Sequence, residues 1–379
     1  MANLFMNATK TQRGMTLIEL MIAMIISLVL LGGVLEVYLG SKQSYNLVEE
    51  SSRLQENGRF AIDIMTREIR STDFWGCLKR PNSTEGSPDQ NLFNGLDQTS
   101  ANYDPRLHDL GEGVIGFDNL TLAGVVSTSD SISLTGGDDC DINVDSVPGN
   151  GSVVFTDIPG CLRENDIAII SNCTGGDIFQ VTGINPNGNL TQVNHNTGNV
   201  SAGPGNYSDP AATDCPGNNA HCFANDHGPD SKIYKVGTKG YDIRPTLRPD
   251  GTFVNGLYRT DSSGVATEII ENVENMQILY GEDTDNPIPN ADRFHIPNQY
   301  VTATDLGYVD SNTPGSVADV VTVRLALLLR GERDLLPEVT AQTHQLLDTP
   351  INTNDRRIYK VFTTTVTIRN RALIDPPPR

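Results

Sequence analysis

Residues 13–35 read RGMTLIELMIAMIISLVLLGGVL, and this stretch decides how the chain begins to fold. Leu20 to Leu35 contains no charged residue, and the longer run from Met15 to Leu35 contains only Glu19. At 1.5 Å of rise per residue, a helix over 15–35 is about 31 Å long, which is close to the hydrocarbon thickness of a bilayer. The stretch therefore predicts a membrane-spanning helix over residues 15–35.

The residues before this helix predict its orientation. Lys10 and Arg13 precede it, residues 1–14 contain no acid, and positive charge tends to stay on the cytoplasmic side. No small-residue cleavage site follows the apolar run, so an ordinary secretory signal peptide fits poorly. We expect the rest of the chain to lie on the other side of the membrane.

Glu19 is the unusual residue of the run, because a carboxylate inside a membrane costs a few kcal/mol and needs a partner. The basic leader, Gly14, Glu19 and the apolar run together resemble the class III signal of type IV prepilins and type II secretion pseudopilins. In that family a membrane-embedded peptidase cuts after the glycine and methylates the new amino terminus. The usual first mature residue of the family is Phe, and here it is Met15.

This resemblance implies roles for three residues. Residues 1–14 would form the leader peptide, cleavage would fall between Gly14 and Met15, and Met15 would be N-methylated. Glu19 would be the assembly carboxylate, which neutralises the amino terminus of a neighbouring subunit. A charge that is costly alone becomes tolerable when it is paired in a low dielectric.

The helix is expected to continue beyond the membrane. Residues 36–73 contain no proline and carry an apolar stripe at helical spacing, so we predict one helix over 15–75. Its first part, 15–35, would form the membrane and filament core, and its second half would pack on a globular domain. The residues assigned to the stripe are Leu47, Leu54, Phe60, Ala61, Ile64, Met65 and Ile69.

Short strands bounded by Gly, Asp or Pro follow the helix and predict antiparallel sheets. We expect a first β region with acidic, loop-rich insertions over 76–232 and a second over 233–379. Residues 79–112 read as a long loop, and 184–230 as either an extended surface insertion or a partly disordered loop. The fold class is therefore α+β: a long N-terminal helix followed by a loop-rich antiparallel β domain. The expected strands are 113–117, 131–134, 153–155, 167–170, 178–181, 233–236, 256–259, 265–270, 276–280, 321–330 and 362–368.

The charge of the chain excludes some function classes. The chain has 47 acidic and 27 basic residues and a net charge of −20, to which residues 76–232 contribute −15. General nucleic-acid binding and docking on anionic lipid headgroups both need clustered Lys and Arg, so neither is expected. The acidity marks one solvated region, in which we expect surface contacts.

The C-terminal part carries a second resemblance. Residues 273–281 (VENMQILYG), 319–330 (DVVTVRLALLLR) and 361–371 (VFTTTVTIRNR) follow one another as in the PilW family of type IV pilus assembly proteins. That resemblance implies a minor pilin with a pilin-like domain in the periplasm, anchored in the inner membrane and incorporated at the pilus tip. Its function would be to prime pilus assembly, in support of adhesion and twitching motility.

The same resemblance implies partners: other minor pilins, the major pilin, the prepilin peptidase and the inner-membrane assembly platform, with a tip adhesin as a further candidate. A J-type pseudopilin of type II secretion is the nearest alternative. A membrane-anchored periplasmic enzyme or binding protein is a third.

Six cysteines in an oxidising compartment are consistent with up to three disulfides. Cys215 and Cys222 bracket a six-residue polar loop, and we favour this pair. The pairing of the other four stays open at this point. These candidate disulfide cysteines are Cys77, Cys140, Cys161 and Cys173.

No sequence motif points to catalysis. The chain has no Gly-x-Ser-x-Gly, phosphate-binding loop or His-Glu-x-x-His, so no catalytic residue and no cofactor is predicted. Cys215, His221, Cys222 and His227 fit no common zinc module. The acids at 138–141 and 283–285 do not follow the EF-hand spacing, so no metal site is predicted either.

Overall fold

A computed structural model gives the fold of residues 15–76, 78, 92–108, 110, 113–120, 124–148, 152–157, 160–197, 202–207, 221–283, 297–306 and 320–371. The chain divides into two compact units, residues 1–53 and 54–379. The leader 1–14 lies outside the described residues. The predicted domain boundaries at 75/76 and 232/233 are not tested by this division and stay predictions.

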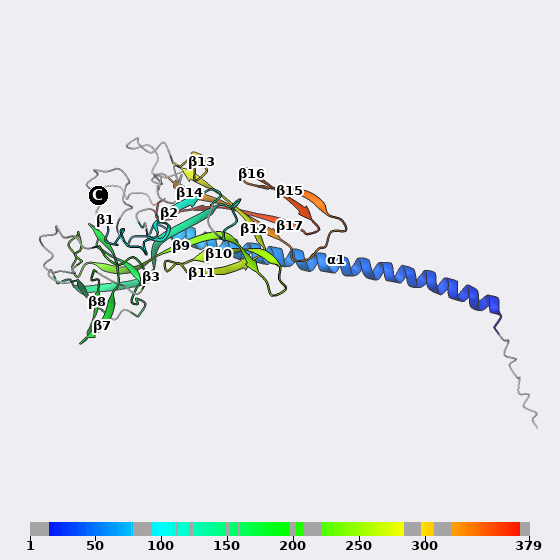
Figure 1. Ribbon diagram of the computed structural model, residues 1–379, viewed down its shortest axis with the longest axis horizontal. Helices are drawn as coiled ribbons and strands as arrows, with labels where there is room; N and C mark the ends of the chain where they lie inside the picture. The colour runs from blue at the N-terminus through cyan, green and yellow to red at the C-terminus, as the bar shows by residue number, and fades with distance from the viewer. Residues whose placement is uncertain are drawn as a thin grey trace, which may run out of the picture. The chain divides into compact units, whose positions relative to one another are not determined.

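One long helix, α1 (Leu17–Ser71), starts the described chain (Figure 1). Its 55 residues contain no proline, so no main-chain donor is missing along its length. Gly32 and Gly33 are helical as well, although each glycine costs about 1 kcal/mol relative to Ala in a helix. The predicted long helix is confirmed, and its observed bounds fall within the expected 15–75.

The remaining described elements are mainly strands, and nearly all their pairings are antiparallel, as predicted. A parallel pair joins β1 to β6. The elements are β1 (Leu92–Asn94), α2 (Pro105–His108), β2 (Val114–Phe117), β3 (Ser131–Ser146), β4 (Val153–Thr156), β5 (Ile167–Ser171), β6 (Gly176–Gln180), β7 (Gly183–Asn187), β8 (Leu190–Asn194), β9 (Lys232–Leu247), β10 (Phe253–Thr260), β11 (Ala266–Glu271), β12 (Val273–Glu282), β13 (Gln299–Val301), β14 (Val320–Arg330), β15 (Thr340–Leu346), β16 (Thr349–Asp355) and β17 (Tyr359–Thr367).

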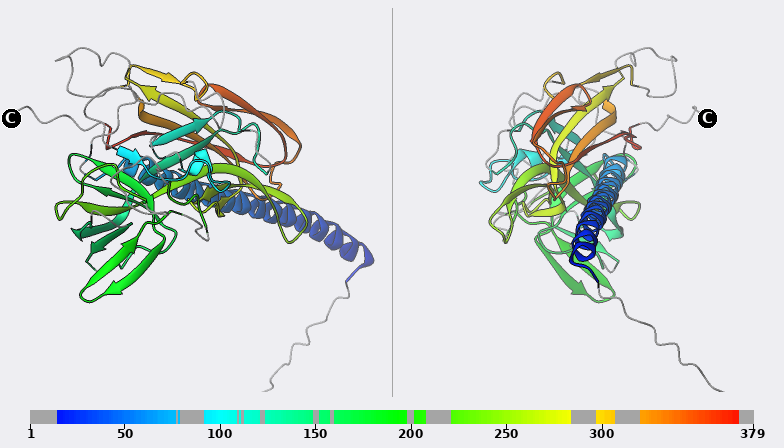
Figure 2. Two further views of the ribbon diagram at one scale, coloured as in Figure 1. Left: turned by 60° about the vertical axis from the view of Figure 1, so that its left-hand side comes forward. Right: turned by 90° about the vertical axis from the view of Figure 1, so that its right-hand side faces the viewer.

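A four-stranded sheet in the order β13-β12-β14-β17 carries the region that resembles PilW (Figure 2). The central strand β14 alternates strongly in sequence, and one of its faces, with Val323 and Leu325, joins the core that the second half of α1 also enters. The other face is buried as well, because Ala326 and Leu328 pack with Leu346 at the end of β15. The hairpin β15–β16, which the sequence did not predict, therefore covers that face.

Two long strands, β3 and β9, run through the larger sheet, whose path is β1-β6-β5-β9-β3-β4-β8-β7. They pair with each other, with an irregularity between Gly137 and Asp141. On one side of this irregularity their residues join the core of the second β region, and on the other side they join a separate core with β4, β5, β6 and β8. The two β regions thus share these two strands.

The structure corrects two loop predictions. Residues 184–230 were expected to be a surface insertion or a disordered loop, but β7 and β8 form a hairpin there and Val193 is fully buried. Within 79–112, β1 and α2 are ordered, and Leu110 is buried in a third core with Trp75. In both segments a few apolar residues among many Asn, Gly and Asp are enough to anchor the chain on neighbouring strands.

Candidate assembly site

The start of α1 is a capping box built by Thr16 and Glu19. The Thr16 backbone N–H donates to Glu19 Oε2 at 3.0 Å, the Thr16 hydroxyl donates to the same oxygen at 3.1 Å, and the Glu19 N–H donates to Thr16 Oγ1 at 3.3 Å. The carboxylate that looked misplaced in the sequence therefore caps its own helix. Both of these hydrogen bonds to the carboxylate go to Oε2, and no described residue donates to Oε1.

The first part of α1 exposes its apolar side chains on every face. It is the one helix in the described part of the chain that is long and apolar enough to cross a membrane, and the whole of its apolar window is unburied. The Ser27 hydroxyl donates to the carbonyl of Ala23, so this polar side chain is satisfied within the helix. An apolar surface all round a helix needs lipid or other apolar helices as its environment.

The second part of α1 has one buried stripe, as the sequence predicted. Leu54, Ala61, Met65 and Ile69 are buried in the core shared with the second β region. Leu47 and Phe60, which were assigned to the same stripe, are 42% and 54% exposed, and those two assignments are wrong. Successive residues turn by about 100°, so Phe60 lies about 120° around the helix from Leu54.

Two contacts fix this half of the helix to the strands. Gly58 faces the ring of Phe362 on β17 so closely that a Cβ at this glycine would lie 2.3 Å from the ring. Lys239 on β9 donates from Nζ to Glu68 Oε2 at 2.7 Å, and both side chains are largely buried. Gly58 allows a close approach of helix and sheet. The Glu68–Lys239 ion pair fixes where along the helix strand β9 is attached.

A buried cluster around Asp73 holds the end of α1. Asp73 adopts a left-handed conformation with φ of 65°, which commonly terminates helices. Its carboxylate accepts a hydrogen bond of 2.7 Å from Trp75 Nε1 and forms an ion pair with Arg371 Nε, whose side chain is 3% exposed. Arg371 also donates from Nη1 to the Val320 carbonyl at 2.9 Å. The cluster therefore joins the helix end to the last described residue of the chain.

Main-chain bonds extend this attachment to the sheet. The Asp73 N–H donates to the Thr135 carbonyl at 2.8 Å, and the Gly137 N–H donates to the Phe74 carbonyl at 2.9 Å. A Cβ at Gly136 would lie 3.1 Å from the Ser71 carbonyl oxygen, so a glycine permits this close approach. The segment that follows α1 thus runs along β3.

The Asp73 cluster was not predicted from the sequence. Its ion pair spans 298 residues, and an Asp after a helix is an ordinary terminator. The position of the single tryptophan beside that Asp was the available signal, because a buried Trp needs an acceptor for its N–H.

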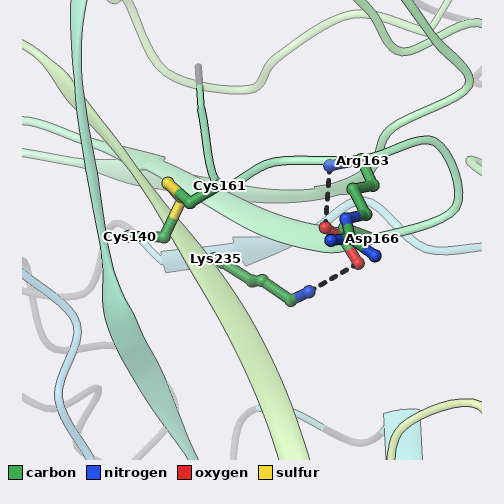
Figure 3. Close-up of a disulfide and its surroundings, with 5 residues drawn as sticks. All are labelled: Cys140, Cys161, Arg163, Asp166 and Lys235. Carbon is green, nitrogen blue, oxygen red and sulfur yellow. Dashed lines mark hydrogen bonds and ion pairs between the residues drawn. A yellow bond between two sulfur atoms is a disulfide. The ribbon is translucent and has the colours of Figure 1, made fainter.

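Cys140 and Cys161 form a disulfide, which settles one of the pairings that the sequence left open (Figure 3). Cys140 lies on β3 at the irregularity of its pairing with β9, and Cys161 lies in the connection between β4 and β5. Nearby, Asp166 accepts hydrogen bonds from the Arg163 N–H at 2.8 Å and from Lys235 Nζ at 2.7 Å (Figure 3). Closing a loop of this size stabilises a fold by about 2–4 kcal/mol.

The other cysteines stay partly undetermined. Cys173 and Cys222 are both disulfide-bonded. Cys77 and Cys215 lie outside the described residues, so the pair Cys215–Cys222 remains a prediction.

Three histidines, His195, His221 and His227, surround the ring of Phe223 next to Cys222. His195 Nδ1 and His221 Nδ1 are 2.9 Å apart, and the ring of His195 stacks on Phe223. His227 Nε2 contacts Asp177 Oδ2 at 2.7 Å, and both side chains are fully buried. Burial lowers the pKa of His221 to about 4 and lowers that of His195 as well. The rings of His195 and His221 pack as core residues, and the His227–Asp177 contact holds segment 221–231 on β6.

Two family models match the chain, one at the start of α1 and one over the second β region. Residues 9–35 match the prokaryotic N-terminal methylation motif, and residues 233–370 match the family described as type IV pilus-assembly protein W. Among curated proteins no significant match is found. No solved structure matches either.

Proposed function

Because this chain belongs to the PilW family of type IV pilus-assembly proteins, we propose that it primes pilus assembly as a minor pilin of the tip complex. In this proposal the chain is anchored in the inner membrane by residues 15–35 and holds its β domain in the periplasm. Its partners are other minor pilins, the major pilin and the assembly platform, and a tip adhesin is a further candidate. Adhesion and twitching motility would depend on the completed pilus.

The observation that carries the proposal is that the first part of α1 exposes apolar side chains all round and carries one carboxylate, Glu19, near its start. An apolar surface with no buried side chain is suited first to lipid and then to the helices of other subunits. Glu19 supplies the one charge within that surface, with Oε1 open to a cationic partner. A protonated amine of a neighbouring subunit fits that partner, because an ion pair in an apolar environment needs both charges close together.

Processing is the first step that can be tested. The prepilin peptidase is proposed to cut between Gly14 and Met15 and to methylate the Met15 amine. The full chain, isolated from membranes and measured by intact mass, should begin at methylated Met15. Replacing Gly14 with Val should leave the uncut precursor in the membrane. Cleavage of that variant at the same bond would contradict this interpretation of the leader.

The role of Glu19 is tested by Glu19→Ala in cells that carry the remaining pilus proteins. The variant should insert in the membrane but be recovered with sheared pili at about a tenth or less of the wild-type level, because the pairing charge is lost. Glu36→Ala is the matched control, since Glu36 is an exposed acid on the same helix outside the apolar run. Recovery of Glu19→Ala at the wild-type level would remove its proposed role.

A deletion tests the pilus role itself. Loss of surface pili with protein secretion intact is the expected result. Loss of secretion with normal pili would instead indicate a pseudopilin, and normal pili with normal secretion would indicate a membrane-anchored protein of another kind.

A further inference from the structure

The end of α1 borders a cavity of about 830 Å³ that lies wholly within the unit 54–379. Its walls come from three places far apart in the sequence: the last turns of α1 with Phe74, the strands β3 and β9, and residues 369–370 after β17. Arg67, Arg70 and Arg369 line it together with the acids Asp63 and Asp141. We call this cavity the helix-end groove.

The acids of the helix-end groove already have partners. Asp63 pairs with Arg67 one turn away at 2.8 Å, and Asp141 pairs with Lys232 at 2.8 Å. Arg70 and Arg369 are exposed, and neither makes a hydrogen bond or ion pair with any other residue in the described part of the chain. Among the described residues, these two guanidinium groups of the groove therefore have no paired acid.

An apolar wall accompanies these two cations. The rings of Phe74 and Tyr234 meet edge to face, with centroids 5.4 Å apart, and both line the groove. Gly137 beside them carries no side chain, and its N–H donates to the Phe74 carbonyl, so the wall is fixed to β3. Arginine and aromatic side chains in one hollow are the composition typical of the energetic centre of a protein interface.

The local structure around the groove is held in place by buried contacts. Asn370 donates from Nδ2 to the Thr72 carbonyl at 2.9 Å, which satisfies a main-chain acceptor left over at the helix end. The next residue, Arg371, is anchored on Asp73. Arg369 and Arg70 are thus presented from two backbone segments that are tied together, so these segments need no rearrangement when a ligand binds.

We propose that the helix-end groove binds an acidic segment of a neighbouring pilus subunit, with carboxylates on Arg70 and Arg369 and an apolar side chain against Phe74 and Tyr234. Charge complementarity carries the proposal: in a chain of net charge −20, a hollow with two unpaired arginines selects an acidic partner. Guanidinium groups bind carboxylates with two parallel hydrogen bonds, which adds geometric specificity.

A peptide segment fits this groove better than a nucleic acid does. Nucleic-acid binding draws on many clustered Lys and Arg, whereas this groove is lined by three arginines, of which Arg67 is already paired with Asp63. The proposal rests on the proposed function, because the neighbouring subunit is one of the pilus proteins.

The test uses the full chain in cells that assemble pili. A photoreactive p-benzoylphenylalanine replaces Thr66, which lines the groove, or the exposed Thr365, which does not, and the crosslinked peptides are identified by mass spectrometry. At Thr66 we expect a crosslink to a pilus subunit at a segment with at least two carboxylates close together. A crosslink to a neutral or basic segment, to nucleic acid or to a second copy of this chain would overturn the proposal.

Charge reversal adds a second readout. Arg70→Glu and Arg369→Glu, together and separately, should each reduce the Thr66 crosslink, and the double variant should reduce it about tenfold or more. Arg163→Glu, an exposed arginine that does not line the groove, should leave it unchanged. Replacing the mapped carboxylates of the partner with Lys should restore the crosslink to the double variant. An undiminished crosslink in the folded double variant would overturn the proposal.

Two controls separate the possible failures. The fluorescence of Trp75, the single tryptophan, reports whether each variant keeps its helix-end structure. If one arginine variant fails to fold, the other, on a different element, still tests the groove. Normal pili after deletion of the whole chain would contradict the proposed function, whereas lost pili on deletion with an unchanged crosslink in the arginine variants would contradict only the groove.

Discussion

The two parts of α1 have similar backbones and opposite surroundings. From Met15 to Val48 the large apolar side chains are exposed or nearly so, whereas from Leu54 to Ile69 one stripe is fully buried against the protein's own strands. Even the glycines differ: a Cβ at Gly40 would meet nothing within 4 Å, but a Cβ at Gly58 would meet Phe362. The apolar side chains in the second part of α1 are thus covered by this chain's own strands. Those in the first part need lipid or other apolar helices around them.

The difference teaches where stability and assembly reside. Burial of an apolar side chain stabilises a fold by about 1.5–3 kcal/mol, and in the second part of α1 this stabilisation comes from within the chain. In the first part the equivalent gain is available only from an outside partner. Substitutions in the second part should therefore change folding, and substitutions in the first part should change membrane residence and assembly.

The largest expected effect is at the helix-end ion pair. Asp73→Asn keeps the shape of the side chain and tolerates the left-handed backbone, but it removes the negative charge that pairs with the buried Arg371. We expect the full chain in detergent micelles to lose about 3–5 kcal/mol of unfolding free energy, measured by urea titration with Trp75 fluorescence.

The control for this prediction is another Asp-to-Asn change near the same helix end. Asp63→Asn removes an exposed ion pair with Arg67 and should cost no more than about 0.5 kcal/mol. If Asp73→Asn were equally mild, the buried ion pair would not be what holds the end of α1.

The next effect compares two methionines of one helix. Met65 is fully buried, and Met65→Ala should lower the unfolding free energy by about 2–5 kcal/mol because it leaves a cavity in the core. Met24 is 62% exposed, and Met24→Ala should change the unfolding free energy of the β domain by less than about 0.5 kcal/mol. Equal losses in the two variants would show that the first part of α1 also packs within the chain.

The smallest effect is that of a Gly-to-Ala substitution, which we expect to stabilise the first part of α1 and to destabilise the second. Gly40→Ala should stabilise the helix by up to about 1 kcal/mol, because Ala has the higher helix propensity and nothing lies in its way. Gly58→Ala should lose more than this gain, with a net cost of about 1–3 kcal/mol, since the ring of Phe362 must move. The melting temperatures of the two variants give this comparison. If Gly58→Ala were stabilising, the ring of Phe362 on β17 would move aside at little cost.

Predictions from the sequence succeeded where the pattern is local and failed where it is not. The long helix and the strands β10, β11 and β14 follow from periodicity and turn residues. The hairpin β15–β16 was missed because its residues are mostly polar, and only Leu346 is fully buried. The Glu19 carboxylate was noticed, yet its bond to Thr16 was not predicted, although Thr-x-x-Glu is a local capping signal.

By itself, the sequence determined the class of this protein: a run of apolar residues with one carboxylate and a glycine before it specifies a prepilin-type helix. Only the tertiary structure decided what surrounds the far end of that helix. The Asp73–Arg371 ion pair, the shared strands β3 and β9 and the helix-end groove all join residues tens to hundreds of positions apart. The physical reason is that local hydrogen bonding and hydrophobic spacing are written along the chain, whereas burial of a charge or closure of a cavity depends on which distant segments meet.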